Sequence, residues 1–249
     1  MFAKNGPSFF ELMHQALSST SRGYDLLAPK FDVTPFRTPD AVLKPAIAAI
    51  SPIDSALDLC CGTGAAMRFL RPLCRERVVG IDFSPGMLAA AKKNMETAPG
   101  EAKVEFVEGD VMKMTFQNEF DVVTCFGALG HILPEEERAF VRLIHRALKP
   151  GGWFVFATGY PPPPLSPANV VMKSFNGIMK VRNALFNPQF IMYYLTFLLP
   201  DIQKLLEEEG FTVAVFKKVY PEPFQKYCLV VAIRSDALGA EEVKVGAKP

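Results

Sequence analysis

The stretch Ala56–Leu70, ALDLCCGTGAAMRFL, decides the fold of this chain. An apolar run typical of a buried strand reaches Asp58, and two cysteines and the turn Gly62-Thr63-Gly64 follow it. A helix-like pattern then begins. The glycines indicate a nucleotide site where a strand gives way to a helix, whereas two adjacent thiols suggest metal or redox chemistry. The remainder of the chain distinguishes between these two interpretations.

Composition and charge favour an ordinary globular protein. The chain has 249 residues, of which 49% are hydrophobic and 21% charged, and its net charge is +1. This balance gives no global field that would attract nucleic acid or a membrane surface. Glu11 and His14 stand where a secretory signal needs an apolar core, and no run approaches the roughly 20 apolar residues of a spanning helix. We therefore expect a cytoplasmic protein.

The cysteines do not form a metal or dithiol motif. The chain has five of them, an odd number, with no C-x-x-C pair. Cys60 and Cys61 would point to opposite sides of a strand, which suits packing rather than joint ligation. We expect reduced thiols that act as small hydrophobic side chains, and no bound metal.

The order of the expected elements predicts an α/β fold with a doubly wound, mostly parallel sheet. Helical patterns at 64–74 and 85–97, and one from Pro134 to 149–152, separate most of the apolar runs. Such alternation favours a parallel sheet that is covered on both faces. Only six residues separate the last two strands, too few for a crossover, so this pair should be antiparallel. The expected strands are 55–60, 77–82, 103–107, 119–125, 153–158, 211–219 and 226–234.

The organisation that we expect has five parts. Residues 1–50 form a helical cap, 51–160 the nucleotide-binding core, and 161–209 a helical lid inserted before the closing strands. Residues 210–236 supply the closing strand pair, and 237–249 a flexible tail. The oligomeric state is left open by the sequence.

The glycine turn fits a nucleoside better than a pyrophosphate. A dinucleotide fingerprint needs a small residue three positions after Gly64, where this chain has the bulky Met67, and no P-loop motif is present. Asp82 ends the second strand, twenty residues after Gly62, where a carboxylate suits paired ribose hydroxyls. Asp58 adds negative charge that repels phosphate and attracts a cation. A cationic, adenosine-bearing ligand satisfies these observations, and S-adenosylmethionine is one.

The stretch FLLPDIQKLLEEEGFTV is similar to a helix and strand start in methyltransferases of quinone and lipid biosynthesis. Five further segments, in order, resemble the class I S-adenosylmethionine-dependent methyltransferases. They are LDLCCGTG, VGIDFSPGMLAAAK, VEGDVMKM, FDVVTCFGALGHI and LKPGGWFVF. The resemblance implies a Rossmann-like sheet of seven strands, and it assigns cofactor contacts to these segments. One departure is Cys60, which stands where the family usually has the first glycine of its loop. The implied cofactor residues are Tyr24, Asp58, Cys60, Gly62, Thr63, Gly64, Asp82, Phe83, Met87, Asp110, Val111, Phe126 and Gly127.

Two residues are candidate general bases for methyl transfer. His131 follows the fourth strand, close to the expected cleft, and could equally be a structural histidine. Tyr24 lies in SRGYDLLAPKFD, which resembles the N-terminal segment that closes over the cofactor in many small-molecule methyltransferases, although it could be an ordinary packed aromatic. Phe83 and Met87 could likewise be core residues.

The segment 161–200 predicts a lid. Lys173, Asn176, Lys180 and Asn183 share one side of a helix, which we expect to be solvated, while Val171, Phe175, Ile178 and Leu185 line the other, which we expect to pack on the sheet ends. The alternative is a lipophilic pocket or contact with an anionic membrane surface. The aromatic residues expected to cover an apolar acceptor are Phe175, Phe186, Phe190, Tyr193, Tyr194 and Phe197, together with Ile178.

The sequence therefore predicts methyl transfer from S-adenosylmethionine to a small, fairly apolar molecule, at an oxygen, nitrogen or carbon atom that the sequence does not specify. A membrane-lipid acceptor, a nicotinamide-dependent oxidoreductase and a non-catalytic nucleoside-binding protein are the alternatives. A nucleic-acid substrate is disfavoured, because no basic stripe with interleaved aromatics and no N-P-P-Y or D-P-P-Y motif occurs.

Overall fold

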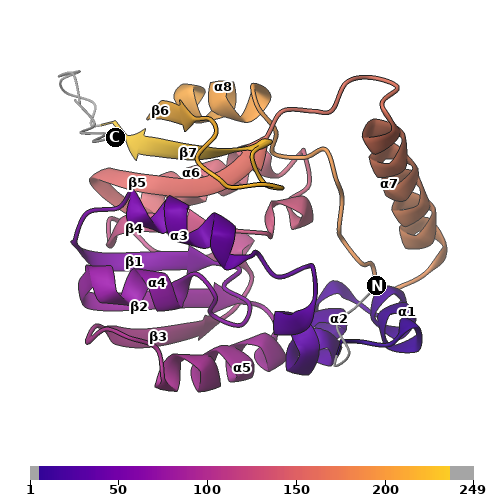
Figure 1. Ribbon diagram of the computed structural model, residues 1–249, viewed down its shortest axis with the longest axis horizontal. Helices are drawn as coiled ribbons and strands as arrows, with labels where there is room; N and C mark the ends of the chain where they lie inside the picture. Colours follow the sequence, from indigo (N-terminus) through magenta and orange to yellow (C-terminus); the bar gives the residue numbers. More distant parts are fainter. Residues whose placement is uncertain (1–5, 236–249) are drawn as a thin grey trace.

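A seven-stranded sheet forms the centre of the molecule (Figure 1). The computed structural model describes residues 6–235. The strands lie in the order β3-β2-β1-β4-β5-β7-β6. Strand β7 lies between β5 and β6 and is antiparallel to both. All other pairs are parallel, as the sequence predicts. The strands are β1 Ile53–Leu59, β2 Cys74–Asp82, β3 Lys103–Glu108, β4 Phe120–Cys125, β5 Leu148–Gly159, β6 Phe211–Phe216 and β7 Tyr227–Arg234.

Each face of the sheet carries its own apolar core. On one face, Leu57 and Leu59 of β1 pack with residues of α6 (Glu137–Ala147) and α8 (Asp201–Glu208). On the other, Ala56 packs with residues of α3 (Asp40–Ala48), α4 (Met67–Leu70) and α5 (Pro85–Glu96). Side chains alternate between the faces of a strand, so one short apolar strand serves both cores. Helix α3, which falls in the segment expected to form the cap, is therefore part of the core layer.

Local chemistry explains where the helices begin and end. Helix α5 begins at Pro85 because the Ser84 side chain accepts a hydrogen bond from the Met87 N–H, and it ends one residue before the predicted position. The predicted helix 64–74 is wrong in extent: the glycine turn delays α4 until Met67, and Pro72 lies in the 3₁₀ turn Arg71–Leu73 that ends it. The helix expected to close at 149–152 ends at Ala147, because that segment already belongs to β5.

The N-terminal segment lies at the carboxyl end of the parallel strands (Figure 1). It comprises α1 (Phe9–Leu17), α2 (Thr20–Leu27), the 3₁₀ turn Ala28–Val33 and the chain from there to the start of α3. Asp25 joins it to the core: its carboxylate accepts hydrogen bonds from the Ser84 hydroxyl at 2.6 Å and the Gly86 N–H at 2.9 Å, at the N-terminus of α5. The flexible tail expected at 237–249 lies outside the described residues.

Helix α7 (Pro167–Leu185) reverses the expected orientation of the lid. Asn169 is buried, and Asn176 and Asn183 also face the protein, whereas Val171, Ile178 and Leu185 face solvent. The helix stands beside the chain that returns to α8 rather than across the sheet ends (Figure 1). The prediction of a solvated polar face and a packed apolar face is therefore wrong for these residues.

The aromatic residues expected beneath the lid are also distributed differently. Phe197 belongs to the sheet core, where its ring meets those of Phe140 and Phe156. Phe186 is exposed. Phe190 is buried and stacks 6.5 Å from the ring of Tyr24.

Within residues 6–235, none of the helices combines the length and the apolar character that a membrane span requires.

Candidate active site

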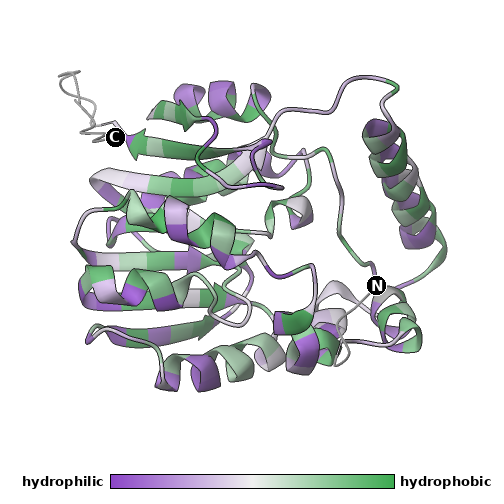
Figure 2. Cartoon of the chain, in the orientation of Figure 1, coloured by the Kyte–Doolittle hydropathy of each residue, from purple (hydrophilic) through white to green (hydrophobic). Residues whose placement is uncertain are grey.

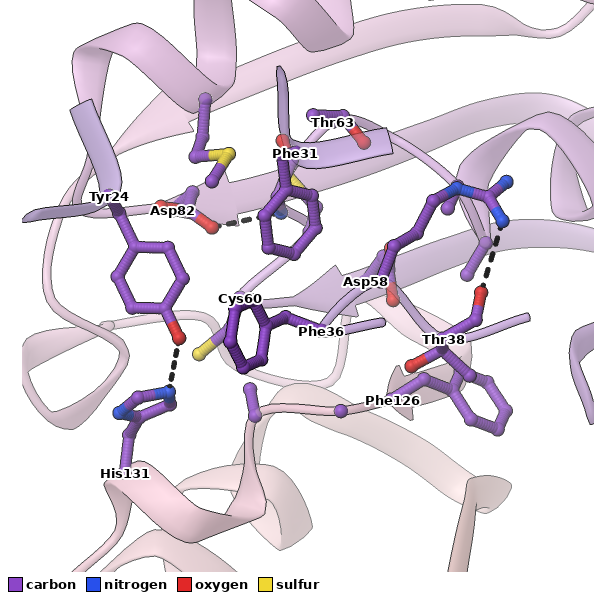
Figure 3. Close-up of a pocket in the computed structure, with 18 of the residues that line it drawn as sticks. Tyr24, Phe31, Phe36, Thr38, Asp58, Cys60, Thr63, Asp82, Phe126 and His131 are labelled. Carbon is purple, nitrogen blue, oxygen red and sulfur yellow. Dashed lines mark hydrogen bonds between the residues drawn. The ribbon is translucent and has the colours of Figure 1, made fainter. Parts of the chain in front are cut away.

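A hollow lies where β1, β2 and β4 end (Figure 3), and its empty volume is about 700 Å³ with the open solvent at its mouth included. The carboxyl ends of parallel strands meet at one edge of a sheet, and this edge is the usual place for a ligand in an open α/β fold. The rings of Phe31 and Phe36, which come from the N-terminal segment, project into the hollow and narrow it.

The turn after β1 forms the floor of the hollow. Cys60, Gly62 and Gly64 all have positive φ angles, of 51°, 53° and 81°. A Cβ atom added at Gly62 would meet nothing nearer than a ring carbon of Phe31 at 3.8 Å, so this part of the backbone is open to a ligand. At Gly64 the nearest neighbours are Ala91 and Met95 of α5, from 3.5 Å, so this glycine serves the turn and its packing rather than the hollow.

Asp82 connects this turn to the end of β2. One carboxylate oxygen accepts the Gly62 N–H and the other accepts the Ser84 N–H, both at 2.9 Å. The side chain is almost fully buried, with 6% of the residue exposed. Burial raises the pKa of the carboxyl in spite of these two N–H donors. Each oxygen has further acceptor capacity toward the hollow, which suits paired hydroxyl groups.

Asp58 lies deeper in the same hollow and is only 3% exposed. Its carboxylate accepts a hydrogen bond from the Thr124 hydroxyl at 2.7 Å. Burial raises the pKa of this carboxyl to about 7, with a smaller contribution from the charge of Asp82 and against the opposing effect of the Thr124 hydrogen bond. No cation of the protein neutralises it among the residues that line the hollow, since Arg37 is bonded elsewhere. A cationic ligand would supply the missing charge.

Tyr24 and His131 form a hydrogen-bonded pair at one end of the hollow (Figure 3). The Nδ1 atom of His131 meets the carbonyl oxygen of Ile191, which can only accept, so Nδ1 carries the proton. Nε2 is then the acceptor, and the Tyr24 hydroxyl donates to it at 2.8 Å. Burial lowers the pKa of His131 and raises the pKa of Tyr24, so both side chains are neutral near pH 7.

The surroundings of this pair are aromatic. The Tyr24 ring lies 6.2 Å from Phe31, 6.3 Å from Phe83 and 6.5 Å from Phe190, and its edge meets the His131 ring at 5.3 Å. These rings surround the pair with apolar groups, and the hydrogen bonds from Tyr24 to His131 and from His131 to the Ile191 carbonyl run between them.

The cysteines behave as small hydrophobic groups. All five thiols are free, and the Cys125 thiol and burial together raise the pKa of Cys60 well above its ordinary value. Across the described residues, 6–235, no group of three or more His, Cys, Asp or Glu side chains is placed to hold a metal ion.

Four wall residues of the N-terminal segment were not anticipated from the sequence: Phe31, Phe36, Arg37 and Thr38. The Arg37 guanidinium binds Asp40 at 2.9 Å and lies 3.3 Å from Asp32, so its charge is neutralised. The Asp32 carboxylate in turn accepts from the Thr63 hydroxyl at 2.6 Å. Phe31 lies in the 3₁₀ turn, and the other three lie in the irregular chain that follows it. Neither stretch has a periodic pattern, so only the aromatic and charged character of these residues could have drawn attention to them.

Most of the predicted site residues meet at the hollow, and three do not. Gly64 faces α5, Val111 is buried in the sheet core, and Asp110 is exposed and caps a 3₁₀ turn by accepting from the Met112 N–H at 2.9 Å. Those that line the hollow are Tyr24, Asp58, Cys60, Gly62, Thr63, Asp82, Phe83, Met87, Phe126, Gly127 and His131.

Comparison with known proteins bears on this arrangement. A family model described as a methyltransferase domain matches residues 56–152. An uncharacterized methyltransferase of Synechocystis sp. is 34% identical over 181 residues, which are 69% of this chain and 73% of that protein. The demethylmenaquinone methyltransferase of Chlorobaculum tepidum is 30% identical over 191 residues, covering 72% of each chain.

Solved structures share the fold. The complex of DhpI with S-adenosylhomocysteine superposes with a TM-score of 0.64 at 20% identity, and the match covers 92% of this chain and 99% of that one. A putative methyltransferase of Bacillus halodurans gives a TM-score of 0.55 at 21% identity, with coverage of 79% and 99%.

Proposed function

Because the chain belongs to the class I S-adenosylmethionine-dependent methyltransferases, we propose that the hollow beneath the N-terminal segment binds this cofactor and that the Tyr24–His131 pair directs methyl transfer to a small, fairly apolar acceptor. The cofactor supplies an electrophilic methyl group on a positively charged sulfur atom. The chain must bind it, exclude water, orient the acceptor and remove a proton where the acceptor carries one.

The observed residues fit such a ligand. Asp82 would accept the ribose hydroxyls, and the open backbone at Gly62 would lie against the nucleoside. Asp58 would face the positive charge, and its unneutralised buried carboxyl supports a cationic ligand over a nicotinamide dinucleotide with its pyrophosphate. Phe83 and Met87, which line the same hollow, would pack against the base. Asp110 is exposed outside the hollow and would meet the amino group of the base only at its outer edge.

The hydrogen-bonded chain Tyr24–His131–Ile191 carries the proposal for catalysis. An acceptor hydroxyl placed against the Tyr24 oxygen could pass its proton to that oxygen as the phenol proton moves to Nε2 of His131. The resulting imidazolium would keep its Nδ1–H on the Ile191 carbonyl, which stabilises the positive charge. A phenolate need not accumulate, in keeping with the raised pKa of Tyr24.

The wall chemistry supports an acceptor without strong negative charge. Among the described residues that line the hollow, the only basic side chains are Arg37 and the neutral His131, and Arg37 is bonded to two aspartates. The rings around Tyr24 favour an aromatic or aliphatic body. The demethylmenaquinone methyltransferase among the relatives is named for an apolar acceptor, which agrees with this inference.

The test is a panel of acceptors with S-adenosylmethionine that carries an isotopically labelled methyl group. Small phenols and quinols should be methylated, whereas phosphorylated amines of similar size should not. Tyr24→Phe and His131→Gln should each lower the rate of transfer to a hydroxyl acceptor by roughly 10²–10⁴-fold while S-adenosylhomocysteine still binds. Turnover of phosphorylated amines alone, or full activity of both variants, would contradict the proposal.

A further inference from the structure

Helix α7 is amphipathic, but its polar face packs on the protein and its apolar face is exposed. At 100° per residue, Val170, Val171, Ser174, Ile178, Val181 and Leu185 fall within about 100° of arc, and we call them the α7 stripe. Every member is exposed; Val171 and Ile178 are 67% exposed and Leu185 is 71% exposed. In Figure 2 hydrophobic and hydrophilic colours alternate along this helix, which stands clear of the sheet. Such a surface, aliphatic at five of its six positions with Ser174 as the exception, marks a binding face rather than ordinary scattered exposure.

The orientation of α7 is fixed by the asparagines on its opposite face. Asn176 exchanges two hydrogen bonds with the backbone of Tyr194, at 2.6 and 2.8 Å, and Asn183 does the same with Phe190, at 2.9 and 3.0 Å. Asn169 donates to the carbonyl of Pro162 at 3.2 Å. These residues are seven apart and satisfy backbone groups of irregular chain that has no sheet partner. The inward face is therefore chosen by hydrogen bonding, and the stripe is left outside.

A second apolar face lies at the same end of the molecule (Figure 1). In α1, Phe9 and Phe10 are 74% and 73% exposed, and Met13 and Leu17 are exposed on the same side of the helix. The two helices are joined, because the Arg182 guanidinium of α7 donates to the carbonyl of Ser18 at 2.9 Å. Of the 17 large hydrophobic side chains that are exposed among the described residues, 11 lie in α1 or between 165 and 186.

We propose that the α7 stripe, with α1 beside it, docks on the surface of an anionic phospholipid bilayer. Between residues 161 and 200 the sequence has no aspartate or glutamate. Its exposed cations, Lys173 and Lys180, lie along one edge of the stripe, where long side chains can reach lipid headgroups while their stems cover apolar surface. An aliphatic stripe flanked by lysines is the pattern of helices that lie in the plane of a membrane interface.

The size of the stripe argues against a second copy of the chain as its occupant. The 19 residues of α7 span about 28 Å and the nine of α1 about 14 Å, so strips with about 100° of arc cover roughly 250 and 120 Å². A stable protein dimer usually buries about 800 Å² on each partner. A bilayer needs no such matching surface, because each inserted side chain contributes separately.

Vesicle flotation of the full-length protein tests this inference, with no acceptor or cofactor present, so its outcome is independent of methyl transfer. The protein should float with vesicles of phosphatidylcholine and phosphatidylglycerol at low salt, and more weakly with phosphatidylcholine alone. Replacing Val171, Ile178 and Leu185 together by serine should lower partitioning by roughly 100-fold, without lowering the melting temperature, because these side chains are exposed.

The charge arm uses a matched pair of variants. Lys173→Gln with Lys180→Gln should lower partitioning into anionic vesicles by roughly 30-fold, since each lysine near such a surface contributes roughly a fivefold step. Lys92→Gln with Lys93→Gln, two exposed lysines on α5, should leave it within about twofold. Arg182 is not a suitable target, because it is buried and holds α7 in place.

Three results would overturn the inference. The first is no flotation with anionic vesicles at low salt. The second is flotation that the serine variant and the paired lysine variant leave unchanged. The third is a dimer, detected by light scattering, that the serine variant abolishes while neither form binds vesicles.

Discussion

Removal of the Asp82 carboxylate should weaken cofactor binding without abolishing the fold. In the free protein this group already accepts the N–H groups of Gly62 and Ser84, and burial raises its pKa, so the fold itself gains little from its charge. We expect its charge to be used by the ligand. Hydrogen bonds to a charged group contribute about 1.5–3 kcal/mol, so Asp82→Ala should raise the dissociation constant of S-adenosylhomocysteine by roughly 10- to 150-fold.

The same change should also lower the free energy of unfolding. It leaves two N–H groups without acceptors, and each such group costs about 1–3 kcal/mol when it stays dry. Isothermal titration calorimetry must therefore be run well below the melting temperature of the variant, with circular dichroism to show that it is folded.

Asp110→Ala is the matched comparison, because Asp110 is the other predicted cofactor carboxylate but is exposed and outside the hollow. Its effect should be tenfold or less, as expected for one exposed hydrogen bond. The reasoning fails if folded Asp82→Ala binds S-adenosylhomocysteine as tightly as the unchanged protein, or if Asp110→Ala weakens binding more than Asp82→Ala does.

Three further predictions concern the turn, the buried acid and the N-terminal segment. The raised pKa of Asp58 means that the folded protein binds the carboxyl proton more readily than the unfolded chain, so the free energy of unfolding should fall as the pH rises from about 4 to about 7. Urea unfolding of Asp58→Asn should lack this fall, so its free energy of unfolding should rise by on the order of 4 kcal/mol relative to that of the wild type across the range. A difference between the two proteins that does not change with pH would refute the raised pKa. Cys60 has a φ of 51°, a value that favours glycine. Cys60→Gly should therefore change the free energy of unfolding by less than about 1 kcal/mol, whereas Cys60→Val, which introduces a β-branched side chain, should lower it by at least about 2 kcal/mol. Equal thermal stability of the two variants would contradict this. Asp25→Ala removes a hydrogen-bond acceptor at the N-terminus of α5, so it should lower the free energy of unfolding by about 1 kcal/mol and weaken the binding of S-adenosylhomocysteine. Unchanged binding would show that this contact does not hold the N-terminal segment over the cofactor.

The strands and their directions could be predicted because each depends on local patterns. Short apolar runs, Ser84 before Pro85, and the six-residue connection before the last strand each reflect a constraint within a few residues. The glycine turn and Asp82 were recognisable for the same reason, since a close backbone approach and a carboxylate at a strand end are local requirements. The antiparallel β7 and the seven-stranded sheet are confirmed.

Tertiary contacts decided the features that the sequence could not predict. The period of α7 defines two faces but does not say which one packs against the protein. The face with the asparagines packs inward, because their side chains form hydrogen bonds with backbone groups of an irregular segment. The walls contributed by Phe31 and Arg37 come from a loop whose path depends on Asp32 and its contact with Thr63, more than thirty residues away. The pairing of Tyr24 with His131 spans 107 residues. Both were individual candidates, but their hydrogen bond could be found only in three dimensions.

The most direct measurement follows a labelled methyl group from S-adenosylmethionine into an extract of cellular metabolites, with products separated between an organic and an aqueous phase. The account predicts label in small molecules of the organic phase, with a rate that falls by roughly 10²-fold or more in Tyr24→Phe and in His131→Gln although both variants still bind S-adenosylhomocysteine. Label that accumulates only in charged aqueous products, in protein or in nucleic acid would contradict the proposed acceptor class. Unchanged transfer in both variants would contradict the proposed role of the Tyr24–His131 pair.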